Sequence, residues 1–189
     1  DRFYNSVTTN VVTRVTLLFP NDPNAAAATP SDIYTGPASF IVTPRMAVSS
    51  YTIVAATGTG NLFTLDSSSF ASRNMVVYPG RAHHLHYENF SSTTMVACET
   101  ISADIVSHDK WHNLVSTGAY VYTGTVQFDW GSKTSMVSAQ DATLPANYTF
   151  TGFAETTPGK KAFGLGGFTL KYAGTRYLTA MDTVNSAIN

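Results

Sequence analysis

The chain has 189 residues, which is enough for one domain with a sizeable hydrophobic core and short for two. Only 12% of the residues are charged, about half the usual share, and 18 Ser and 27 Thr supply most of the polarity instead. A net charge of -1 argues against a nucleic-acid partner, and no run of residues is long and apolar enough for a transmembrane helix. The single cysteine, Cys98, excludes an internal disulfide.

The first segment alternates in polarity over residues 7–19, as a strand with one buried face does. We expect Val11, Val15 and Leu17 to point inward from this strand. Residues 20–32 contain three prolines together with Asn and Asp, which predicts a loop.

Short apolar or alternating runs bounded by turn residues follow along the rest of the chain. They include ASFIVTPRMAV, SYTIVAA, NLFTL, MVVYPG, TTMVACETISADIV, AYVYTGTVQFDW, NYTFTGFA, AFGLGGFTLKY and RYLTAM. About ten strands at this spacing are typical of an antiparallel β-sandwich or jelly roll. We therefore predict an all-β fold, as a single β-sandwich domain over residues 1–189. Only residues 107–115 have a helical pattern, with Ser107 as the N-cap.

The segment RAHHLHYENF, residues 81–90, is the first candidate for chemistry. On a strand, His84, His86 and Glu88 would share one face, with Leu85 and Tyr87 on the core face. Two imidazoles and a carboxylate on one face are possible metal ligands.

A second pair, His108 and His112, has the i, i+4 spacing of metal-binding histidines on a helix. If this pair met His84, His86 and Glu88, five ligands would be available. Nothing in the sequence brings the two segments together, and outward histidines are satisfied by water. We therefore expect no specific metal, and whether this face binds one stays open.

Other catalytic patterns are missing from the sequence. Cys98 has no basic neighbour, so we expect a small packed residue on a strand and not a reactive thiol. The glycines of residues 164–167 predict a bulge or a close strand crossing and not a phosphate loop. A glycosidase pair could still assemble from distant strands, but the carboxylates show no paired spacing: Asp66, Glu88, Glu99, Asp104, Asp109, Asp129, Asp141 and Glu155. We therefore expect no enzyme, with no catalytic, cofactor-binding or metal-binding residues and no cofactor.

Tyr120, Tyr122, Trp130 and Tyr148 form another possible site, a platform on which a sugar could stack. On an all-β chain their period-2 spacing favours the core instead.

The sequence VVYPGRAHHLHYEN resembles the second motif of the cupins, in which a Pro-Gly turn precedes a strand with a histidine ligand. Gly80 and His83 fit that spacing. The cupins also need an earlier motif with two histidines and a glutamate, and residues 1–82 contain no histidine. A cupin-like metal-dependent enzyme is therefore the third alternative, while a non-catalytic jelly roll is compatible with the chain.

As a whole, the hydroxyl-rich, charge-poor β chain resembles the protruding domain or shell jelly roll of a small RNA-virus capsid protein. That resemblance implies a virion location, self-association as a dimer or trimer in particle assembly, and attachment to a host receptor, with a glycan as one candidate. The start at Asp1 inside a strand-like run suggests a piece of a longer chain, without the basic arm that contacts the genome. The first alternative is a carbohydrate-binding or adhesin β-sandwich of bacterial or phage origin.

Overall fold

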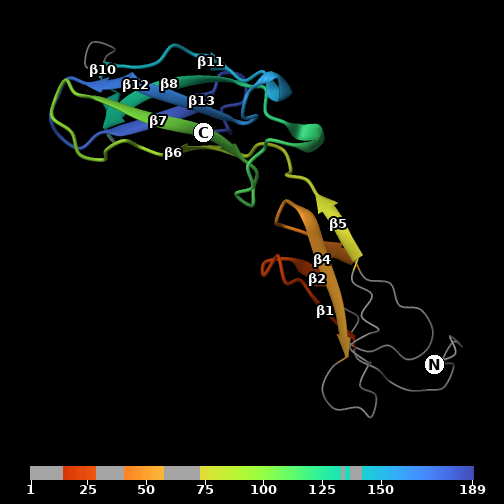
Figure 1. The fold of residues 1–189 in the computed structure, drawn as a ribbon. Helices are drawn as coiled ribbons and strands as arrows, with labels where there is room; N and C mark the ends of the chain where they lie inside the picture. The colour runs from red at the N-terminus through yellow and green to blue at the C-terminus, as the bar shows by residue number, and fades with distance from the viewer. Residues whose placement is uncertain (1–14, 29–40, 58–72, 133–134, 137–141) are drawn as a thin grey trace, which may run out of the picture. The chain divides into compact units, whose positions relative to one another are not determined.

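A computed structural model describes residues 15–28, 41–57, 73–132, 135–136 and 142–189. The chain divides into two compact units, residues 1–78 and 79–189, and each is described by itself. Both consist mainly of antiparallel strands, as the sequence predicted, and the helices among the described residues are single 3₁₀ turns (Figure 1). The expected number of strands and the expected single domain stay predictions.

The N-terminal unit contains a three-stranded sheet and a separate pair of strands. The sheet order is β1-β4-β5. Its strands are β1 (Val15–Leu18), β4 (Val48–Thr57) and β5 (Arg73–Val77), and the separate pair is β2 (Ala26–Ala28) with β3 (Ile41–Thr43). Of the predicted first strand only β1 is described, with Leu17 half-buried. Val11 and the Val15 side chain lie outside the described residues.

A buried carboxylate organises this unit. Asp22 is almost fully buried and accepts hydrogen bonds from the backbone N–H groups of Arg45 and Met46, at 2.6 and 2.8 Å. The hydroxyl of the buried Tyr51 donates a third bond at 3.2 Å. Burial alone would raise the pKa of Asp22, but these hydrogen bonds outweigh it and lower the pKa.

The C-terminal unit contains two further sheets (Figure 1). The first has the order β10-β12-β7-β6, and the second has the order β11-β8-β13 with β9 paired to β8. The strands are β6 (His84–Glu88), β7 (Thr100–His108), β8 (Thr125–Ser132), β9 (Ser135–Met136), β10 (Ala142–Thr143), β11 (Tyr148–Thr149), β12 (Lys160–Leu170) and β13 (Tyr177–Asp182).

Aromatic rings from the two sheets meet in the core of this unit. Phe128 on β8 contacts Phe163 and Phe168 on β12, with ring centroids 5.0 and 5.7 Å apart in tilted, edge-on geometry. Beside these rings lies a larger buried cluster: Leu85, Ile105, Val115, Tyr122, Val126, Phe150, Ala180 and Ile188. The apolar positions of β6, β7 and β8 therefore face one shared core.

Two local predictions are wrong and one is confirmed. Ser107 does not cap a helix, because β7 continues to His108 and residues 109–113 form a tight turn. Cys98 is exposed in a turn with a φ of 71°, and not packed on a strand. The glycine run at residues 164–167 does mark a bulge, since the register of β12 on β7 shifts between Phe163 and Phe168.

A hydrogen bond between two buried side chains, Tyr122 and Asp182, lies in the core of the C-terminal unit. The buried carboxylate accepts the Tyr122 hydroxyl at 2.6 Å and the backbone N–H groups of Val184 and Asn185. A Cβ atom at Gly124 would clash with both members of this pair. Burial alone would raise the pKa of Asp182, but the three hydrogen bonds lower it.

We expect Tyr122→Phe to lower the free energy of unfolding by about 1–3 kcal/mol at pH 7, because a buried carboxylate loses a donor. A lowered folded-state pKa gives stability that is present above the unfolded pKa and is lost as the pH falls through the folded value. The effect of Tyr122→Phe should therefore shrink below about pH 4. Urea denaturation at pH 7 and pH 3 measures both quantities.

Tyr120→Phe is the matched control, because Tyr120 is exposed and its ring contact with Arg81 survives the change. We expect an effect within about 0.5 kcal/mol. Equal effects of the two substitutions would show that the Tyr122–Asp182 bond does not stabilise the unit.

Candidate metal centre

Two neighbouring strands place the first two histidines side by side. β6 pairs with β7 in antiparallel register, so that His84 lies opposite His108 and His86 lies opposite Val106. The alternation predicted for the segment is confirmed: Leu85 is buried, His86 is exposed, and His84 and Glu88 are half-buried. The side chain of His84 therefore shares a face with that of His108.

A turn stabilised by Asp109 brings the third histidine to the same place. One carboxylate oxygen of Asp109 accepts the backbone N–H groups of Trp111 and Asn113, at 2.8 and 3.0 Å, and the other accepts the N–H of Gly80 at 2.9 Å. The chain then turns back so that Leu114 forms a bridge with His108. His112 adopts a φ of 62° within this turn, a left-handed conformation that is uncommon outside glycine.

The fold gathers all five histidines of the chain. Two come from β6 and one lies just before it at His83, while His108 ends β7 and His112 lies in the turn. Ring centroids are 4.5 Å apart for His84 and His112, and 5.6 Å apart for His84 and His108. The rings of His86 and His108 are 5.8 Å apart.

Three of these rings converge at the distances of a metal site. One nitrogen from each of His84, His108 and His112 lies within 4.8 Å of the other two. The Nε2 atom of His84 is 3.3 Å from Nδ1 of His112. In a tetrahedral zinc site with Zn–N bonds of about 2.0–2.1 Å, two ligand nitrogens are roughly 3.3 Å apart. One pair already has this spacing.

His108 is the most deeply buried member of the cluster. It is 8% exposed, and its Nδ1 atom has no hydrogen-bond partner among the described residues. Burial lowers the pKa of His108, with only partial opposition from the nearby carboxylate of Glu88. Burial and the neighbouring imidazoles also lower the pKa of His84. Neutral rings with an available nitrogen are the form that binds a metal.

A carboxylate lies near the ring of His108. Oε1 of Glu88 is 3.9 Å from Nε2 of His108, and its other oxygen is 3.3 Å from Nζ of Lys160. Lys160 also contacts Asp104 at 2.9 Å. The separation of Glu88 and His108 is too long for a hydrogen bond, so the carboxylate places a negative charge near the ring without fixing its orientation. Because Lys160 contacts both Glu88 and Asp104, these two carboxylates form an ion-pair network and not a free acid–base pair.

The sequence identified five possible ligands but not which of them meet. The structure brings His84, His108 and His112 together, while His86 and Glu88 lie at the edge of the group. The meeting was missed because residues 107–115 were interpreted as a helix. Asp109 and Asn113, both turn-forming residues, were the available signal. The expectation of no metal stays a prediction, but the geometry favours the alternative that the sequence left open.

The remaining candidates do not join this cluster among the described residues. Of the aromatic platform, Tyr122 is buried, Tyr148 is half-buried and Tyr120 is exposed. The Trp130 side chain lies outside the described residues, as do Asp66 and Asp141. In the cupin-like motif, the backbone N–H of Gly80 donates a hydrogen bond to the carboxylate of Asp109. Nδ1 of His83 is 3.4 Å from Nδ1 of His84.

Comparisons with protein-family models, curated proteins and solved structures found no match to this chain. Within the described part of the chain, no helix has the length and apolar character needed to cross a membrane. The functional argument therefore depends on the geometry of the site itself.

We expect Asp109→Asn to destabilise the unit by about 1–3 kcal/mol, because an amide N–H₂ would face one of the N–H donors that the carboxylate now accepts. Thermal and urea unfolding measure this change. Lys110→Gln, an exposed substitution in the same turn, should change stability by less than about 0.5 kcal/mol. If Asp109→Asn is as stable as the parent chain, the carboxylate does not hold the turn.

Proposed function

We propose that the C-terminal unit binds one transition-metal ion of the zinc type through His84, His108 and His112. The observation that carries this proposal is the convergence of three imidazole nitrogens within 4.8 Å around a buried histidine whose Nδ1 atom has no partner among the described residues. Nitrogen ligands favour zinc, copper, nickel or iron, whereas calcium and magnesium prefer oxygen.

The three ligands come from different segments of the chain, so a bound ion would cross-link them. His84 belongs to β6, His108 to β7 and His112 to the turn that follows, so one ion would join three segments that are otherwise held by hydrogen bonds and packing. Three protein ligands leave the fourth tetrahedral position to water or an external ligand. The ion would stabilise the folded state by an amount that grows with the logarithm of its concentration relative to its dissociation constant, since the unfolded chain lacks the site.

Zinc titration of the metal-free protein, in competition with a coloured chelator, tests this proposal. We expect one ion per chain and an upward shift in melting temperature. His108→Asn should weaken binding by more than about 100-fold, because it removes a ligand and not only a supporting group. His86→Asn is the matched control, since His86 is exposed on the same strand, and its affinity should stay close to that of the parent chain.

Two results would contradict the metal proposal. One is the absence of saturable binding at micromolar zinc, and the other is an equal loss of affinity in His86→Asn and His108→Asn. Elemental analysis of protein purified without a chelator gives an independent measurement of the bound metal.

A second candidate function is favoured by the apolar surface. Large apolar side chains are exposed in both units, with Ile41 76% exposed and Leu165 79% exposed. We infer that the chain self-associates, as a virion-surface capsid domain of β-sandwich or jelly-roll type would, and that it attaches to a host receptor such as a glycan. The ring contacts between two sheets of the C-terminal unit support the sandwich proposal. The adhesin alternative needs no self-association.

Light scattering at micromolar concentration tests this second candidate, with a dimer or trimer as the expected result. Leu165→Ser should weaken association without loss of stability, because the flanking Gly164 and Gly166 positions open into free space. Ile41→Ser makes the same change on the N-terminal unit and reports whether that surface takes part. A monomer at millimolar concentration would contradict self-association and favour the adhesin.

A further inference from the structure

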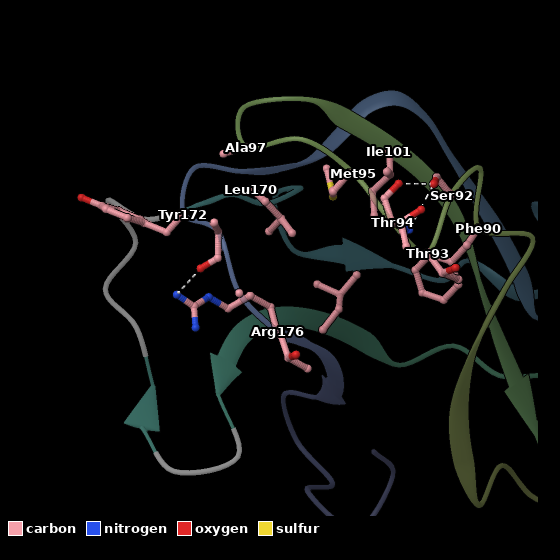
Figure 2. A pocket seen from close by; sticks show the side chains of 14 residues that line it. Phe90, Ser92, Thr93, Thr94, Met95, Ala97, Ile101, Leu170, Tyr172 and Arg176 are labelled. Carbon is pink, nitrogen blue, oxygen red and sulfur yellow. Dashed lines mark hydrogen bonds between the residues drawn. The ribbon is translucent and has the colours of Figure 1, made fainter.

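A cavity separate from the histidine cluster lies in the C-terminal unit. It has a volume of about 490 Å³ and lies between residues 90–97, the start of β7, the end of β12 and the start of β13 (Figure 2). This volume is within the range of small-molecule pockets. The larger aliphatic and phenyl side chains that line it are Phe90, Met95, Ile101, Leu170 and Leu178.

The lining is chemically asymmetric. Ser92, Thr93 and Thr94 add hydroxyl groups along one part of the wall, and Arg176 is the one charged residue in the lining. Figure 2 shows the Arg176 side chain at the edge of the group, with its guanidinium directed toward the carbonyl of Ala173. That hydrogen bond is long, at 3.4 Å. Among the described residues no carboxylate pairs with Arg176.

We propose that this pocket binds a small amphipathic monocarboxylate, of the fatty-acid class. An apolar wall favours an alkyl chain, since burial of apolar surface is favourable in proportion to area. An arginine that has no ion pair within the described part of the chain is suited to a carboxylate, with which it forms charge-assisted, bidentate hydrogen bonds. A single cation in the lining matches a single negative charge, so the ligand carries one carboxylate at one end of the alkyl chain.

The pocket is independent of the metal proposal. Ile101 lies at the beginning of β7 and His108 at its end, so the same strand contributes to both sites from opposite ends. Binding should therefore be the same with zinc or with a chelator present. Failure of one proposal leaves the other intact.

Calorimetric titration of the whole chain with octanoate and with 1-octanol, in the presence of a chelator, tests the inference. The two probes share the alkyl chain and differ in the carboxylate. We expect saturable binding of octanoate that Arg176→Gln weakens about tenfold or more, because a charged hydrogen-bond donor is lost. The affinity for 1-octanol should change by less than about threefold, since the alkyl chain contacts the same wall.

Two further variants separate the charge from the cavity. Lys171→Gln removes an equal charge from an exposed position outside the lining, and it should leave octanoate binding unchanged. Met95→Trp fills the cavity and should weaken both probes. A melting curve for each variant verifies that it is folded. The proposal is overturned if octanoate shows no saturable binding in the millimolar range, or if Arg176→Gln and Lys171→Gln have the same effect.

Discussion

The register of β6 on β7 is the constraint on which the C-terminal unit depends. Pairing His84 with His108 also pairs Leu85 with Ser107 and Tyr87 with Ile105. Because side chains alternate between the faces of a sheet, a shift of one residue would expose Leu85 and move the histidines into the core. The apolar contacts of Leu85 and Ile105 with the rest of the core therefore fix the register, and the register in turn brings two imidazoles together.

Two features of the histidine cluster lower the stability of the folded state. A buried nitrogen without a hydrogen-bond partner costs about 1–3 kcal/mol, and Nδ1 of His108 has none among the residues that the structure describes. A non-glycine residue in the left-handed region, such as His112, adds a further cost. Both residues lie in the same small region, where the hydrogen bonds of Asp109 hold the turn. A metal ion held by His84, His108 and His112, as proposed above, would give the constrained turn a function.

Local pattern predicted the faces of the strands, and it could not predict which strands meet. The alternation of residues 84–88 placed Leu85 inward and His86 outward correctly, because a buried face imposes a period of two. The glycines near Leu165 also marked a bulge correctly. The helix at residues 107–115 was wrong because the polar contacts of Asp109 determine that turn, and the i, i+4 spacing of two histidines is equally compatible with a tight loop. The pairing of His84 with His108 is a long-range contact that depends on the whole core.

The two proposed sites differ in how well they can be predicted from the sequence. Histidines are few and conspicuous, so the metal site needed only the correct pairing of two segments. The apolar pocket is formed by ordinary residues such as Ile101, Leu170 and Leu178, which in sequence cannot be distinguished from core residues. At about 3.3 Å per residue, Ile101 and His108 are roughly 23 Å apart along β7. At that separation, substitutions in the two sites should have additive effects on stability. Strand β7 therefore contributes to both proposed sites, which are chemically unrelated and lie one at each end.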